Sequence, residues 1–380
     1  MPQRDQSTLE DTEAAVLDVA PPTLAITAAP TLLKIPSWLL RIMALVVGMF
    51  IFIIALELLK KGAGGYGRIL IKSLKIDGPT NSLGFGWLLA YLFLSGSPVA
   101  AVAVSFFASG TLNALQTFTM ITGSRLGASF IVLFVGFIYY MQGHRRAASI
   151  SIGVLALLTT AAIYLPALPI GYWMLTSGIL DTVRVNTETP ISSVLDVVID
   201  PIVNTLVAWL PSWSLLIVGA ATLLSAFKLL DRALPDMGPE QSAFRRIGSL
   251  VYRPMAMFLL GAAVTSLTLS VSVSLSILVP LSARGLVRRE NTVPYIMGAN
   301  ITTFIDTLVA ALITGGPAAF TIVLVEMTSV AILSLLVLIF AYRPFERAIL
   351  RLQEHIIHNN VTLGIFLGIM LMVPLGLLFL

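Results

Sequence analysis

One pattern of glycines and serines occurs twice in the chain, and it constrains the fold more than any other feature. Residues 86–125 and 261–300 follow the same plan at an offset of 175, since 270 − 95 and 298 − 123 both equal 175. The matched positions are Gly86 and Gly261, Ser95 and Ser270, Ser97 and Ser272, Gly110 and Gly285, and Gly123 and Gly298. In an apolar chain, a duplication with polar interruptions at matching places is typical of transporters whose binding site lies between two repeats.

The composition places this duplication in a membrane. The chain is 57% hydrophobic and only 11% charged, whereas soluble domains carry roughly 25% charged residues. The bilayer must therefore be the solvent for much of the surface. The chain has no cysteine, which excludes disulfides, thiolate metal sites and a cysteine nucleophile.

Apolar segments long enough to cross a bilayer recur along the chain. A spanning helix needs about 20 mostly apolar residues, and this criterion predicts seven crossings at 38–59, 115–140, 150–175, 206–230, 294–314, 318–342 and 361–380. Residues 83–94 and 99–109 are each too short to span, and they meet at Ser95-Gly96-Ser97-Pro98. They predict a hairpin that enters and leaves on one side, and residues 255–286 predict a second one.

These segments predict an all-α polytopic membrane protein built from two inverted-topology repeats, each with a re-entrant helical hairpin and a broken transmembrane helix. The predicted organisation is a disordered tail (1–33), repeat 1 (34–176), a polar connection (177–205), repeat 2 (206–342), and an amphipathic loop with a last transmembrane helix (343–380). The first helix is expected to end at Lys60-Lys61 and the glycine-rich stretch after it.

Lysine and arginine in short loops predict the orientation. The basic loops are 144–146, 228–253, 284–289 and 343–351. If these loops lie inside the cell, the N-terminus also lies inside. The polar connection and the C-terminus then lie outside. Only the basic stretch 60–75 disagrees with this arrangement.

The serines at the predicted hairpin tips are the first candidates for a site. Hydroxyls and freed backbone N–H groups at a tip can surround a small ion, and opposed helix N-termini favour an anion. The alternative is that serines merely allow helices to pack closely. Because the clusters are matched in a duplicated chain, the site interpretation is preferred.

The glycine-led segments after the tips are the second candidates. Gly123 and Gly127 bracket Arg125, and Gly298 precedes Asn300. Glycines there either unwind a helix and expose carbonyls for Na⁺, or they are helix-packing glycines, which are common in membrane spans.

Arg125 is the most unusual residue in an apolar segment, because a charge at that depth is costly unless it faces a cavity or a partner. Its planar fork of donors suits an oxyanion. The alternative is a structural ion pair, for which Asp306 is the candidate partner. Asp306 could also hold a cation or carry a proton. Glu326, near the start of its helix, is expected close to the membrane interface.

A family resemblance rests on these residues. The stretch 261–286, followed by Gly298-Ala299-Asn300-Ile301-Thr302-Thr303, resembles the type II sodium-dependent phosphate cotransporter family, as does the Glu57-Leu58-Leu59-Lys60-Lys61-Gly62 end of the first helix. The family has Gln-Ser-Ser-Ser tips and a Gly-Ala-Asn-Ile-Gly-Thr-Thr break. Here Leu94 and Leu269 stand at the glutamine positions, and Arg125 stands at the first asparagine position.

The resemblance implies a secondary transporter with a central site, Na⁺ as the coupling ion and a small inorganic anion as substrate. The candidate substrate-binding residues are Ser95, Ser97, Arg125, Ser270, Ser272 and Asn300. The candidate Na⁺ ligands are Ser95, Ser129, Ser270, Thr302, Thr303 and Asp306.

The resulting prediction is Na⁺-coupled symport of inorganic phosphate or a similar oxyanion, by alternating access at the repeat interface, in the plasma (inner) membrane. The partners would be the lipid bilayer, the anion and Na⁺ or H⁺, with no nucleic acid; a homodimer is one option for the oligomeric state. The alternatives are an H⁺-coupled transporter of a different anion, and a transport-inactive membrane interaction protein with this fold. An enzyme is not expected, because the histidines (144, 355 and 358) lie in basic loops and no paired carboxylates or serine–base arrangement is evident.

Overall fold

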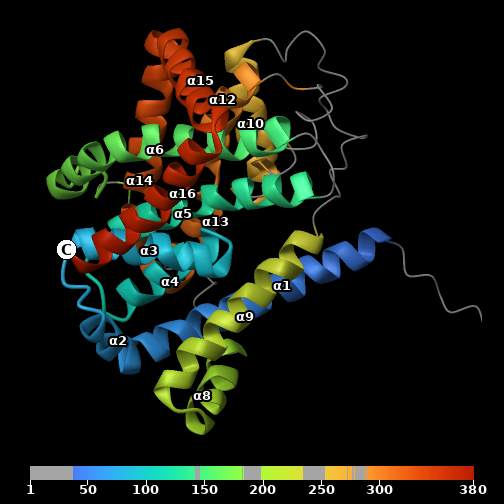
Figure 1. Ribbon diagram of the computed structural model, residues 1–380. Helices are drawn as coiled ribbons and strands as arrows, with labels where there is room; N and C mark the ends of the chain where they lie inside the picture. Colours follow the sequence, from blue (N-terminus) through green and yellow to red (C-terminus); the bar gives the residue numbers. More distant parts are fainter. Residues whose placement is uncertain are drawn as a thin grey trace, which may run out of the picture.

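The computed structural model describes residues 37–141, 146–181, 183, 198–233, 253–271, 273–275, 278, 287 and 289–380, and within these it contains helices and no strand (Figure 1). Seven helical segments of this part are long and apolar enough to cross a membrane: Leu39–Ser73, Ala114–Phe134, Ile150–Ser177, Ser212–Arg232, Arg289–Thr314, Gly316–His358 and Asn360–Phe379. They correspond to the seven predicted crossings. The chain is thus an integral, multi-pass membrane protein. The predicted tail, 1–33, lies outside the described residues.

The first helix is longer than predicted. Helix α1 (Ser37–Gly62) continues through a π-helical turn, η1 (Ala63–Gly67), into α2 (Arg68–Ser73). The predicted end at the lysines and glycines is wrong because the glycines serve packing. A Cβ atom on Gly62 would lie 2.9 Å from the Leu216 backbone nitrogen of α9, which runs alongside α1 (Figure 1).

Short helices occupy the described parts of the two predicted hairpin positions. Helices α3 (Pro79–Phe93) and α4 (Ser97–Ala108) are joined by a turn of three residues, and α10 (Pro254–Thr268) lies at the start of the second predicted hairpin, most of whose remainder is outside the described residues. The residue after α3 is Leu94 and the residue after α10 is Leu269, and they have left-handed φ values of 49° and 48°. A left-handed leucine is uncommon, so its occurrence after both α3 and α10 shows the duplication in the backbone itself.

Matched glycines bring α3 against a later helix, and α10 against another. A Cβ atom on Gly123 of α5 (Ala114–Met141) would overlap the Leu83 carbonyl oxygen, and one on Gly298 of α12 (Arg289–Thr302) would overlap the Phe258 carbonyl oxygen. Leu83 and Phe258 are themselves 175 apart. Close approach of the two backbones is possible only because no side chain intervenes.

The same glycines correct the predicted breaks. Helix α5 is continuous through Gly123 and Gly127, so the first half of the chain has no broken helix at that place. In the second half the chain does break, but after Thr302, between α12 and α13 (Ile305–Thr314). The packing alternative therefore holds for these glycines.

The predicted crossing 206–230 is also divided. It contains the end of α8 (Asp200–Trp209) and most of α9 (Ser212–Ala233). The division falls at Pro211, which lacks the N–H that a continuous helix needs.

The remaining helices complete one bundle. They are α6 (Arg146–Ser177), α14 (Gly316–Leu336), the π-helical η5 (Val337–Ala341), α15 (Tyr342–His358) and α16 (Asn360–Phe379). The segment predicted as an amphipathic loop is helical, as α15. A continuous apolar core contains residues from both halves, and α4 of the first half contacts α13 of the second. This contact positions the site.

Candidate functional site

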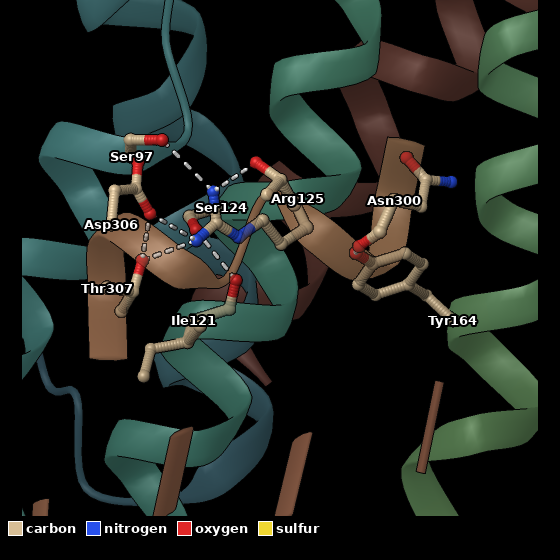
Figure 2. A network of polar contacts seen from close by, with 9 residues as sticks. Ser97, Ile121, Ser124, Arg125, Tyr164, Asn300, Asp306 and Thr307 are labelled. Carbon is tan, nitrogen blue, oxygen red and sulfur yellow. Dashed lines mark hydrogen bonds and ion pairs between the residues drawn. The ribbon is translucent and has the colours of Figure 1, made fainter. Parts of the chain in front are cut away.

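Arg125 lies at the centre of a buried polar cluster. Its side chain projects from α5 between the two halves and is 1% exposed. One terminal nitrogen, Nη1, donates to Ser97 Oγ at 3.3 Å and to Thr303 Oγ1 at 3.2 Å, and Nη2 donates to Thr307 Oγ1 at 2.5 Å (Figure 2). The guanidinium is therefore held by hydroxyls from both halves of the chain.

The ion pair between Arg125 and Asp306, which was the alternative to oxyanion binding by Arg125, is present. Arg125 Nη2 lies 3.6 Å from Asp306 Oδ1, and that oxygen accepts a hydrogen bond of 2.8 Å from Thr307 Oγ1. The guanidinium carbon also lies 4.8 Å from the ring centre of Phe304, a cation–π distance. Removing one partner of a buried ion pair costs much more free energy than the pair contributes when it forms. Arg125 and Asp306 therefore stabilise each other's position.

Two helix starts converge on the guanidinium. Ser97 begins α4, and Thr307 lies in the first turn of α13. Among the described residues, no side chain caps either helix start. Helix N-termini present unpaired N–H groups and partial positive charge. Together with Arg125 they make this region favourable for an anion.

A second layer of hydrogen bonds lies beside the first. Asn300 Nδ2 donates to Thr160 Oγ1 at 3.0 Å, and Ser129 Oγ donates to the same oxygen at 2.9 Å. Tyr164 Oη donates to the Asn300 carbonyl oxygen at 2.8 Å, and its ring stacks on Phe304 at 6.2 Å. Helix α6 thus holds α12 just before its break.

The structure brings together some of the predicted site residues. Ser97, Arg125, Thr303 and Asp306 form the cluster, with Ser129 and Asn300 in the second layer.

Others lie apart from it. Thr302 donates to the Ala262 carbonyl oxygen of α10, and Ser270 accepts from the backbone of Val273 at its own tip. No hydrogen bond joins Ser95 to the cluster within the described part of the chain. Ser272 lies outside the described residues.

Several cluster residues carry no clear mark in the sequence. Thr307 and Phe304 lie outside the duplicated motif, and Thr160 and Tyr164 are ordinary residues of an apolar span. Glu326 was expected at the membrane interface, but it is fully buried. Only the four-residue spacing of Thr160 and Tyr164, which puts both on one helix face, could have indicated a shared role.

A small cavity reaches Asp306 from one side. Its volume is about 50 Å³, room for a few water molecules. It is lined by residues of α1, α9, the second tip and α13: Met49, Phe52, Phe227, Leu230, Asp231, Thr268, Leu269, Ile305, Asp306 and Val309. The exposed Asp231 and the buried Asp306 thus border the same space.

These features define a class of protein: a multi-pass helical membrane protein whose charged centre is built from both halves of the chain. The family model described as Na+/Pi-cotransporter matches residues 222–373, and this match supports membership of that family. The matched range includes α10 and the break at Thr303, while Arg125 lies outside it. The family points to a transport protein rather than an enzyme. No curated protein and no solved structure matches the chain.

Proposed function

We propose that the protein is a secondary active transporter that couples Na⁺ to the symport of inorganic phosphate or a similar small oxyanion in the plasma (inner) membrane. The observation that carries the proposal is the environment of Arg125. Its planar fork is buried between two helix starts and is surrounded by hydroxyls rather than by a carboxylate in bidentate contact. A tetrahedral oxyanion can replace these neutral acceptors and form stronger, charge-assisted bonds.

The geometry of Arg125 leaves donors for such a ligand. Its Nε atom has no hydrogen-bond partner among the described residues. The Asp306 oxygen contacts Nη2 only at 3.6 Å, longer than a good charge-assisted hydrogen bond. An oxyanion would therefore improve the hydrogen bonding of the guanidinium, and Ser97 and Thr303 would turn their hydroxyl protons toward it.

Inverted repeats with re-entrant hairpins are part of the proposal, and the position of α3 supports them. Asn81 near the start of α3 donates to the Leu378 carbonyl oxygen at the end of α16, while Tyr91 near the tip donates to Met370, halfway along α16. A hairpin that starts at one end of a spanning helix and turns beside its middle is what re-entry requires. Alternating access would then open the centre to each side in turn.

Na⁺ coupling is proposed from the family match, with Asp306 and Thr303 as ligands. A proton is the second candidate, because Asp306 and Glu326 are both buried carboxyl groups close to the centre. The two ions make different predictions for uptake. Na⁺ coupling requires a Na⁺ gradient at constant pH, whereas proton coupling requires a pH gradient and ignores Na⁺.

The direct test is uptake of radiolabelled phosphate, and of sulfate and arsenate in parallel, into proteoliposomes with an imposed Na⁺ gradient. Uptake should require Na⁺ and should be lost in Arg125→Lys, which keeps the charge but not the planar fork. Arg347→Lys, an exposed site on α15, is the matched control and should leave uptake unchanged. If none of the three oxyanions enters under either gradient while the protein stays folded, transport of this class is excluded.

A further inference from the structure

Glu326 is a buried carboxyl group that the proposed oxyanion site does not use. It lies on α14 and is 0% exposed. Neither of its carboxylate oxygens accepts a hydrogen bond from any described residue. A carboxylate without partners is very costly in such surroundings. A group other than the described residues must therefore balance it.

The surroundings of Glu326 connect it to the centre. Thr122 and Arg125 of α5 are among its polar neighbours, and Tyr164 of α6 lies within electrostatic range. The Thr122 hydroxyl gives its proton to the Phe118 carbonyl oxygen at 3.1 Å. Because this proton is engaged, the Thr122 oxygen is suited to act as a ligand for a cation. Oxygen atoms are the ligands that a hard monovalent cation prefers.

Close helix packing fixes Glu326 in this place. A Cβ atom on Gly171 of α6 would overlap the Phe118 ring and would lie 3.2 Å from Ser329 Oγ. Ser329 in turn donates to the Glu326 carbonyl oxygen at 2.9 Å. Helices α5, α6 and α14 therefore meet at this point.

The charges of the centre do not balance without a ligand. Around Arg125 the described residues place one permanent positive charge and two carboxyl groups, Asp306 and Glu326. Arg125 is already paired with Asp306. Ionised Glu326 would leave one excess negative charge, and a bound oxyanion would add at least one more. Like charges in a low-dielectric interior repel strongly, so the anion and Glu326 can coexist only with a cation.

We propose that Glu326 is a cation-carrying site, which holds one Na⁺ or one proton next to the Arg125 centre. This extends the proposed transport function, on which it rests, by assigning a residue to the coupling ion. Its occupation removes the repulsion that otherwise opposes anion binding. The site thereby makes cation and anion binding mutually dependent, which is the thermodynamic requirement of symport.

Cation binding can be tested without any transport. Thermal unfolding of the full-length chain in detergent is measured in NaCl and in choline chloride at equal ionic strength, at a mildly acidic and a mildly alkaline pH. A ligand that binds only the folded state raises the midpoint. The wild type should be stabilised by Na⁺ at the alkaline pH if the ion is Na⁺, or by acid regardless of Na⁺ if it is a proton.

Glu326→Gln should lose whichever response the wild type shows, because the amide has the same shape and no charge. Glu57→Gln is the matched control, since Glu57 lies at the end of α1 in a pair with Lys60 at 3.4 Å. It should keep the response. The proposal is overturned if Glu326→Gln shows the same shift in unfolding midpoint as the wild type. It is also overturned if the wild-type midpoint responds to neither Na⁺ nor acid.

A measurement on the wild type covers the case in which Glu326→Gln does not fold. Dicyclohexylcarbodiimide modifies buried carboxyl groups in their protonated form, and peptide mass spectrometry locates the product. Glu326 should be labelled, and Na⁺ or alkaline pH should suppress the labelling; an unlabelled Glu326 at acid pH overturns the proposal. The cation site and the transport function can fail separately. If Na⁺-driven uptake persists in Glu326→Gln, only the cation site is overturned. If Glu326 binds a cation but no oxyanion is taken up, only the transport function is overturned.

Discussion

At the scale of single residues, the centre depends on a few groups that satisfy one another. Arg125 is 1% exposed and makes three hydrogen bonds, one ion pair and a cation–π contact. A guanidinium cannot lose its charge, so each of these contacts lowers the cost of burying it. The contacts come from α4, α13 and the turn between α12 and α13, so the residue also holds the two halves in register.

The first prediction concerns the buried pair. Arg125→Met should destabilise the protein by about 3–5 kcal/mol, because Asp306 would remain buried without its partner. The double variant Arg125→Met/Asp306→Leu should recover most of this loss, since no charge then remains. Thermal unfolding in detergent measures both. A double variant less stable than the single one would show that Arg125 stabilises the fold mainly through its hydroxyl partners.

The second prediction concerns Tyr164. Tyr164→Phe should cost about 1–3 kcal/mol of unfolding free energy, because the Asn300 carbonyl oxygen loses its donor while staying buried. Tyr172→Phe on the same helix removes a hydroxyl from a side chain that is 51% exposed, and it should change stability by less than about 0.5 kcal/mol. Denaturant unfolding in detergent compares the two. Equal effects would mean that Tyr164 acts through its ring on Phe304.

At the scale of helices, the duplication shows itself as contacts between backbones. Gly86 and Gly261 face the carbonyl oxygens of Met120 and Tyr295, and these pairs are again 175 apart. Helices α3 and α10 therefore each approach a later helix closely at a matched glycine. Gly123, Gly127 and Gly298 were ambiguous in the sequence between unwinding and packing, and their close contacts assign them to packing.

The third prediction tests that assignment. Gly123→Ala and Gly298→Ala should each destabilise the protein by about 3 kcal/mol or more, because the new methyl group meets a backbone carbonyl that cannot move aside. Gly364→Ala in α16 is the control, since a Cβ there meets nothing within 4 Å. It should be neutral or slightly stabilising, as alanine favours helix. Comparable unfolding midpoints for all three variants would argue against close packing.

The fourth prediction concerns the left-handed tip residues. Leu94→Gly should be neutral or stabilising in thermal unfolding, because glycine adopts a φ of +49° without the roughly 1–2 kcal/mol penalty of a side chain. Leu92→Gly, two residues earlier inside α3 and 74% exposed, should instead cost about 1 kcal/mol of helix stability. If Leu94→Gly proves the more harmful change, the Leu94 side chain contributes packing that outweighs its backbone strain.

At the scale of the whole molecule, the orientation in the membrane connects the loops with the site. Gln353 of α15 donates to Ser151 near the start of α6 at 2.7 Å, so the basic helix α15 lies at the same end of the bundle as the start of α6. Both belong to the side that the positive-inside rule places in the cytoplasm. We therefore expect the end of α6, and Asp181 shortly after it, on the outside.

The fifth prediction follows from this arrangement. Because the chain has no cysteine, single cysteines can be added without further changes. Arg347→Cys, exposed on α15, should react with an impermeant maleimide only after cells are permeabilised, whereas Asp181→Cys should react in intact cells. Labelling of both from the same side would contradict the orientation.

The class of fold could be predicted from the amino-acid sequence. Runs of about 20 apolar residues require spanning helices wherever they occur, because an unpaired backbone is too costly in lipid, and all seven were predicted near their observed places. The duplication likewise follows from identities at a constant spacing. The pairing of Arg125 with Asp306 was also foreseeable, since few charges lie within the apolar segments and opposite charges there seek each other.

Which of the candidate residues meet could be learned only from the packing of the helices. Ser97, Thr303 and Thr307 gather at Arg125, while Thr302 turns to α10 and Ser270 stays at its tip. Neighbours in sequence on a helix point in different directions, so a motif cannot tell which of its hydroxyls faces the centre. The burial of Glu326 was equally hidden, because its depth depends on how closely α5 and α6 approach α14, and Gly171, which no sequence motif marks, permits that approach.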